Sequence, residues 1–139
     1  MIQIILLDRY IILSYSSANS EEGETMKIIE NIIPVLHVSS LQNSIQYYED
    51  KLGFKLNWED SSFAGVYRDG FGIMLHQNSS LVQQQVWIGL HEMDALYVEY
   101  VSSNVVFIQK PENHRWAYDM KIEDLDGNIL WFGTEPKTD

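Results

Sequence analysis

The sequence predicts an α+β protein built from two tandem βαβββ modules. Short apolar, β-branched segments alternate with two segments whose apolar residues fall at helical spacing. The order strand, helix, strand, strand, strand occurs over about residues 28–78 and again over about residues 84–135. The pattern leaves one alternative open, a single irregular α+β sheet.

The first module opens with an apolar segment at residues 32–38, which is typical of a strand covered on both faces. Ser39 and Ser40 follow, and a serine hydroxyl there can accept a hydrogen bond from a free amide of a helix's first turn. The predicted helix spans residues 41–52 and ends at Gly53, a residue suited to the left-handed conformation. Its apolar stripe consists of Leu41, Ile45, Tyr48 and Leu52.

Three strands complete the predicted first module, at residues 55–59, 63–68 and 71–76. The last two are separated by Asp69-Gly70. This pair is a strong signal for a two-residue hairpin, because both residues accept positive φ angles.

The second module repeats this order with little similarity in sequence. A strand is predicted at residues 84–90, and a helix follows with an apolar stripe and closes at Ser102-Ser103-Asn104. The stripe consists of Met93, Leu96, Tyr97, Tyr100 and Val101. Three strands are predicted after it, at residues 105–109, 117–123 and 128–132, the last two joined around Asp126-Gly127.

Residues 1–26 are predicted to be an N-terminal extension or linker before a domain at residues 27–136. Residues 1–15 are apolar, but Asp8-Arg9 interrupts them and no basic residue precedes them, unlike a signal peptide. The segment is also too short to span a membrane. Residues 14–25 have the composition of a linker.

Composition limits the possible partners. The formal net charge is −11 with only nine Lys and Arg, which argues against nucleic acid and favours a cationic ligand. The chain has no cysteine. Disulfides, thiolate metal sites and a cysteine nucleophile are therefore excluded, and we expect a cytoplasmic protein.

Several stretches resemble the glyoxalase/bleomycin resistance protein/extradiol dioxygenase superfamily, also called the vicinal oxygen chelate superfamily. The likeness covers about residues 30–135 and is strongest toward bleomycin-resistance proteins. The stretches are residues 34–38, 44–48, 52–54, 63–69, 86–88, 94–97 and 124–128. The resemblance implies a curved mixed sheet around a concave cavity. It also implies a homodimer with ligand grooves at its interface.

Enzymes of this superfamily hold a divalent metal with four side chains, two from each module. Carried over to this sequence, the four positions are occupied by Ile33, Met74, Gln85 and Trp131. Ile and Trp cannot ligate such an ion, and a thioether and an amide carbonyl are weak ligands for it. We therefore expect no metal, no other cofactor and no catalytic residue.

Histidines elsewhere offer one way to rebuild a metal site. Strand alternation directs His37, His76 and perhaps His91 toward the cavity. We expect these side chains to sit near strand ends and to form hydrogen bonds or contact a ligand. The alternative is a relocated metal site. His114 lies in a polar loop, where we expect it to be solvated.

The four tryptophans, Trp58, Trp87, Trp116 and Trp131, are the main candidates for ligand binding. The resemblance implies that the positions of Trp58, Phe63 and Trp116 line a groove for a flat heteroaromatic group; their alternative role is core or dimer packing. The complete candidate set is Trp58, Phe63, Trp116, His37, His76, Trp87 and Trp131. After Trp116 the family usually continues with Gly-Arg, whereas this chain has Ala117-Tyr118.

The sequence thus predicts a metal-free, dimeric small-molecule binding protein that protects the cell by sequestering a flat cationic compound, such as an antibiotic. Aromatic faces stack on planar or cationic ligands, which supports this hypothesis. One alternative is a metal-dependent lyase or dioxygenase that uses relocated histidines. Another is a scaffold module without a ligand.

Overall fold

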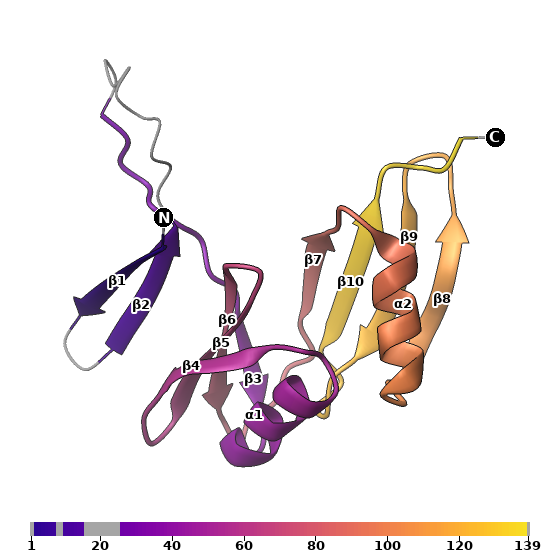
Figure 1. The fold of residues 1–139 in the computed structure, drawn as a ribbon. Helices are drawn as coiled ribbons and strands as arrows, with labels where there is room; N and C mark the ends of the chain where they lie inside the picture. Colours follow the sequence, from indigo (N-terminus) through magenta and orange to yellow (C-terminus); the bar gives the residue numbers. More distant parts are fainter. Residues whose placement is uncertain (1, 8–9, 16–25, 139) are drawn as a thin grey trace.

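The computed structural model describes the backbone of residues 2–7, 10–15 and 26–138, and the side chains of residues 26–138 (Figure 1). A hairpin of β1 (Ile2–Leu7) and β2 (Tyr10–Tyr15) precedes two four-stranded sheets. In the part of the chain that is described, no helix has the length and apolar character needed to cross a membrane.

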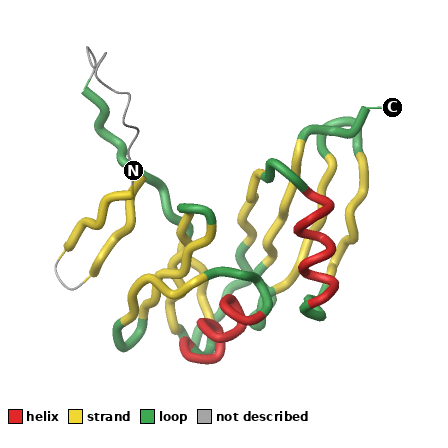
Figure 2. Tube along the Cα trace, in the orientation of Figure 1, coloured by secondary structure: helices red, strands yellow, loops and turns green. Residues whose placement is uncertain are grey.

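Each module forms its own mixed sheet with one helix, as Figure 2 shows. The first module contains β3 (Val35–Val38), α1 (Leu41–Asp50), β4 (Lys55–Glu59), β5 (Phe63–Arg68) and β6 (Phe71–Gln77). The second contains β7 (Gln85–Gly89), α2 (Met93–Ser102), β8 (Phe107–Asn113), β9 (Tyr118–Glu123) and β10 (Ile129–Thr134). The strand orders are β3-β6-β5-β4 and β7-β10-β9-β8, and in each sheet the first pair is parallel. The predicted fold class is confirmed; the sheets are not closed into a barrel.

Local signals in the sequence act near the ends of these elements, although α1 ends at Asp50, before the predicted end at residue 52. The hydroxyl of Ser40 accepts a hydrogen bond from the amide of Asn43 at the start of α1. After α1, Gly53 has a φ of 76°. Asp69 and Gly70 have φ angles of 52° and 84°, the left-handed pair that a tight hairpin requires.

Two predicted strands are displaced. β3 begins at Val35 rather than at residue 32, and Ile32 is 86% exposed. Pro34 has no amide to donate, so the paired residues begin at Val35, although the carbonyl of Pro34 accepts a hydrogen bond from the amide of Met74. β8 spans residues 107–113 rather than 105–109 and contains Pro111, which is tolerated because β8 is an edge strand.

The predicted boundary between extension and domain stays a prediction. The apolar segment at residues 2–15 pairs as the β1-β2 hairpin, and β2 lies beside β4. Residues 16–25, which contain most of the predicted linker, lie outside the described residues.

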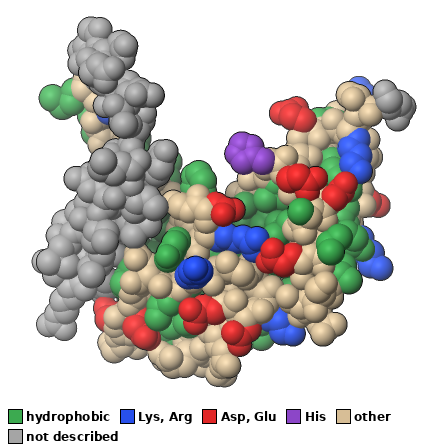
Figure 3. Space-filling view, in the orientation of Figure 1, with side chains coloured by type: hydrophobic (Ala, Val, Ile, Leu, Met, Phe, Trp, Pro, Cys, Tyr) green, Lys and Arg blue, Asp and Glu red, His purple; other side chains and the backbone are tan. Residues whose placement is uncertain are grey.

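Both modules contribute to one hydrophobic core, because alternate residues of each sheet face its helix. Leu36 and Leu75 of the first sheet and Leu130 and Phe132 of the second are buried together with Tyr48 of α1. The opposite faces of both sheets carry the polar and aromatic side chains considered below. On the face shown in Figure 3, hydrophobic and basic side chains lie in the region between the modules.

A buried carboxylate joins the modules. Asp124, in the turn before β10, accepts hydrogen bonds from the hydroxyl of Tyr48 (2.9 Å) and from the backbone and side-chain amides of Asn128 (2.9 and 3.0 Å). Asn128 in turn donates to the carbonyl of His37 on β3. Burial, followed by the charge of Asp124, raises the pKa of Tyr48 well above its usual value, so the phenol remains a donor.

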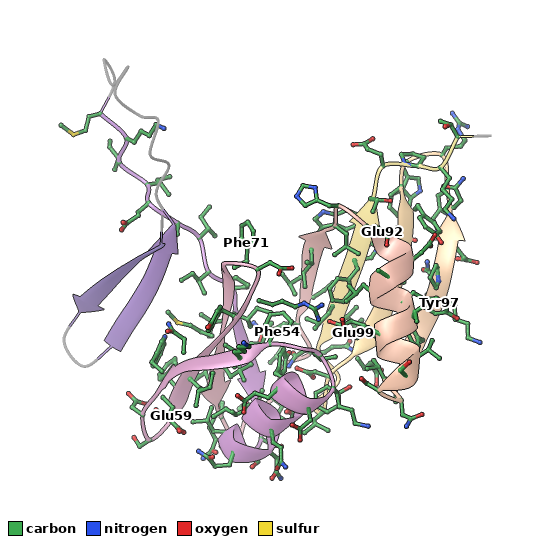
Figure 4. The ribbon with its side chains drawn as sticks, in the orientation of Figure 1. Phe54, Glu59, Phe71, Glu92, Tyr97 and Glu99 are labelled. Atoms are coloured by element: carbon green, nitrogen blue, oxygen red, sulfur yellow. The ribbon has the colours of Figure 1, made fainter. Side chains whose placement is uncertain are left out.

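An ion pair makes a second connection between the two modules. The guanidinium of Arg68 on β5 donates to both carboxylate oxygens of Glu99 on α2, at 2.6 and 2.8 Å, and also to the carbonyl of Leu52. Figure 4 places Glu99 on the side of α2 that faces the first module. The bidentate contact lowers the pKa of Glu99. Because the pair is partly exposed, its contribution to stability is modest.

We predict that Tyr48→Phe lowers the free energy of unfolding by about 1–3 kcal/mol, because Asp124 loses a buried donor while no cavity is created. Urea denaturation at fixed protein concentration measures the change. Tyr67→Phe is the matched control, since Tyr67 is only half-buried. Equal effects of the two substitutions would show that the Tyr48–Asp124 hydrogen bond does not stabilise the module interface.

Candidate functional site: a tryptophan cluster on the second sheet

The first sheet brings three predicted site residues together. His37 on β3 lies opposite His76 on β6, and His76 lies opposite Phe63 on β5. The rings of Phe63 and His76 stack at 4.1 Å between centroids, and those of His37 and His76 meet edge-on at 5.4 Å. Among the described residues, the buried Nδ1 of His37 has no hydrogen-bond partner. The two histidines therefore share a face of the first sheet, and their direction toward a ligand cavity stays a prediction.

Trp58 lies on the same sheet, over Gly65 of β5, where a β-carbon would collide with the indole ring. It lines a shallow hollow in the surface together with Ile33 and Met74. Two of the four family metal positions thus meet in one hollow. The side chains there offer an alkyl group and a thioether.

The second sheet gathers the other three tryptophans. Trp87 and Trp131 lie side by side on β7 and β10, with ring centroids 4.9 Å apart and planes at 88°. Trp116, in the loop before β9, meets Trp131 at 5.7 Å and 81°. Trp87 is 47% exposed and Trp116 58% exposed. We call Trp87, Trp116 and Trp131 the tryptophan cluster.

Glycines and a buried carboxylate position this cluster. Trp87 lies over Gly133 of β10, where a β-carbon would collide with its ring. Asp119 on β9 is 1% exposed, and its Oδ2 accepts from the indole nitrogen of Trp131 at 2.7 Å. Its Oδ1 accepts from the side-chain amide of Gln109 at 2.7 Å. A buried carboxylate costs free energy unless it is well hydrogen-bonded, and these donors supply the bonds.

His114, which we expected to be solvated, has a side chain that is 33% exposed and that also contacts the cluster. Its ring stacks on Trp116 with centroids 4.9 Å apart and planes at 5°. Its Nε2 lies 3.2 Å from Oδ1 of Asp119. The stack covers one face of Trp116, so a chain of contacts leads from the buried carboxylate to an exposed ring.

Lys121 lies two residues beyond Asp119 on β9 and is paired with Trp131 across the strands. Its ammonium nitrogen lies 4.9 Å from the centroid of the Trp131 ring, a cation–π distance. Neither Asp119 nor Lys121 was among the predicted site residues. The available signal was that Asp119 and Lys121 are two residues apart on one strand and therefore share a face. Its meaning depends on the neighbouring strands, β8 and β10, which the sequence does not identify.

The seven predicted site residues therefore form two groups, one on each sheet. His37, Trp58, Phe63 and His76 belong to the first sheet, and the tryptophan cluster belongs to the second. Trp58 and Phe63 are thus on a different sheet of the chain from Trp116, the third residue of the predicted groove.

The residues at the four family positions do not fit a divalent metal. Ile33 and Met74 line the hollow near Trp58, while Gln85 and Trp131 lie on the second sheet. Over residues 26–138, no three His, Asp or Glu side chains come together as a potential metal site. His91, expected near the end of a strand, lies in the exposed loop between β7 and α2.

The sequence model of the Glyoxalase/Bleomycin resistance protein/Dioxygenase superfamily matches residues 32–132. Together with the paired βαβββ modules, this match shows that the chain belongs to that superfamily. A comparison with curated protein sequences found no relative.

Solved structures share the fold at low sequence identity. A bleomycin resistance determinant encoded on the transposon Tn5 has a TM-score of 0.71 and 17% identity, over 77% of this chain and 98% of that chain. TioX from Micromonospora sp. ML1 has a TM-score of 0.68 and 14% identity, over 76% and 99%. A virulence protein from Salmonella typhimurium has a TM-score of 0.63 and 20% identity, over 78% and 99%.

We predict that Asp119→Asn destabilises the fold by about 2–4 kcal/mol and shifts tryptophan emission to the red. One buried oxygen becomes an NH2 group that faces an N–H donor, so Trp131 or Gln109 loses its acceptor. Urea denaturation and emission spectra measure the two effects. Asp50→Asn, at an exposed position on α1, should change stability by less than about 0.5 kcal/mol. An unchanged emission spectrum in Asp119→Asn would contradict the positioning role of Asp119.

Proposed function

We propose that the protein is a non-enzymatic binder of a flat, positively charged aromatic small molecule. The observation that carries this proposal is the tryptophan cluster, which exposes aromatic surface on the sheet face where enzymes of the superfamily place part of their metal site. A large exposed apolar surface needs a functional reason in a folded protein. Aromatic rings give large contact area with planar ligands and lose little conformational entropy on binding.

Electrostatics supports a cationic ligand. The net charge of −11 attracts cations, and acidic side chains are distributed over the face shown in Figure 3 rather than gathered at one point. Sequestration of such a compound would lower its free concentration in the cell. This is the sense in which we propose a role in resistance to an antibiotic or a similar toxic molecule, in the cytoplasm.

We further propose that two chains pair to form the ligand groove. Within one chain, Trp58 and Phe63 lie on the first sheet, and Trp116 lies in the loop before β9 and contacts Trp131 of the second sheet. A two-fold dimer that places the first sheet of one chain against the second sheet of its partner would unite these rings. Because such an interface is isologous, it creates two equivalent grooves.

We predict that bleomycin or ethidium quenches tryptophan fluorescence with about one ligand per chain. Trp116→Leu and Trp87→Leu should each weaken binding by about tenfold or more, because each removes about 1–3 kcal/mol of stacking with a planar group. Phe71→Leu is the control, since Phe71 is 78% exposed at the β5–β6 turn, outside both groups (Figure 4). No quenching by either compound in a folded dimer would overturn the proposal, as would equal losses in all three variants.

The metal-dependent alternative has a direct test. We predict that protein purified without chelators contains less than about one tenth of an equivalent of nickel, zinc, iron or manganese, because the residues at the family positions supply no good donor. Elemental analysis measures this content. A stoichiometric metal that His37→Ala and His76→Ala remove would favour a lyase or dioxygenase with relocated histidine ligands.

A further inference from the structure

We propose that Lys121 determines which ligands the tryptophan cluster accepts, because its ammonium group already occupies the cation-binding face of Trp131. This inference rests on the proposed function and adds a specificity residue to it. Among the described residues, Lys121 takes part in no salt bridge. Its ammonium nitrogen lies 4.9 Å from the centroid of the Trp131 ring, so it makes a cation–π contact with this ring.

The strand register keeps this ammonium in place. Lys121 lies directly opposite Trp131 on β10 and opposite Gln109 on β8. Two acids share its face of β9, Asp119 and Glu123, each two residues away along the strand. The oxygens of Asp119 already accept from Trp131 and Gln109. Neither carboxylate forms a salt bridge with Lys121, so the ammonium stays at the ring.

A tethered cation competes strongly with a dissolved one. Lys121 is on the strand next to Trp131, so its ammonium is present at the ring at a high effective concentration. A ligand cation that approaches Trp131 must displace this group and meets like-charge repulsion while it does so. Compact cations, whose affinity depends on a free ring face, are selected against.

Broad, flat ligands keep their binding surface. The edge-on contacts of Trp87 and Trp116 with Trp131 leave these two rings 47% and 58% exposed. His114 covers one face of Trp116, and the side chain still exposes aromatic surface that a planar ligand can contact. The cluster is thus suited to an extended planar aromatic whose positive charge lies away from Lys121, and not to a simple quaternary ammonium ion.

The test compares Lys121→Met with the unaltered protein, using three probes of defined charge. Ethidium is a broad flat cation, phenyltrimethylammonium is a compact cation, and 1-anilinonaphthalene-8-sulfonate is a flat anion. We expect Lys121→Met to bind phenyltrimethylammonium about fivefold or more tightly and ethidium about two- to fivefold more tightly, and to bind the anion more weakly. Tryptophan quenching or calorimetry gives the constants.

Two control variants separate the specific effect from general ones. Lys27→Met makes the same change in net charge at an exposed position outside both sheets and should leave all three constants unchanged. Lys121→Arg should keep the discrimination against compact cations, because a guanidinium also covers an aromatic face. Thermal unfolding confirms that each variant is folded.

The outcomes are distinguishable. Tighter binding of both cations with the larger gain for phenyltrimethylammonium, together with weaker binding of the anion, supports the inference, and equal gains for the two cations would overturn it. Unchanged constants, or tighter binding of cations and anion alike, would overturn it while leaving the proposed function intact, since the second result reflects only the added apolar surface. If no probe binds either protein, the proposed function fails and the inference fails with it.

Discussion

The arrangement of the two modules depends on one buried carboxylate. Asp124 receives hydrogen bonds from Tyr48 of α1 and from Asn128 before β10, and Asn128 also donates to the carbonyl of His37 on β3. A helix, a turn and a strand from different modules therefore converge on one group. An uncompensated charge at this depth would cost several kcal/mol, on the order of 3–5 for a broken buried pair. Hydrogen bonds are directional, so those that Asp124 accepts orient the two sheets relative to each other. Each sheet carries one of the two groups of site residues.

A second buried carboxylate plays a comparable part at the candidate site. Asp119 accepts a hydrogen bond from the indole N–H of Trp131. His114 contacts Asp119 and stacks on the exposed ring of Trp116, so it links the buried carboxylate to that ring. Hydrophobic contact alone is non-directional and would leave large rings free to choose among several orientations. The hydrogen bond to Asp119 selects one orientation for Trp131. The cluster then combines a held ring with two exposed ones, which is the property expected of a stacking surface for planar ligands.

Much of the fold was predictable from the sequence because its signals are local. The structural effects of Ser40, Gly53 and Asp69-Gly70 extend over only a few neighbouring residues. The structure has the predicted N-cap at Ser40 and positive φ angles at Gly53, Asp69 and Gly70. Predictions of strand limits failed where pairing decides them. β3 starts only where β6 provides a partner beyond Pro34, and β8 extends through Pro111 because no strand lies outside it. Neither fact can be derived from the segment's own composition.

The sequence by itself determined the order of elements, the superfamily, and the loss of suitable ligands at Ile33, Met74, Gln85 and Trp131. The order of elements follows from hydrophobic periodicity and turn chemistry, which need no knowledge of distant neighbours. The superfamily and its four ligand positions follow from a resemblance carried by short stretches of the chain. Only the tertiary structure decided that Asp119, His114 and Lys121 belong with the tryptophans. Their contacts join β8, β9 and β10, and the strand register sets which side chains meet across them. The physical reason is that hydrogen bonds and ring contacts act over a few ångströms, and only folding brings residues distant in sequence within that range.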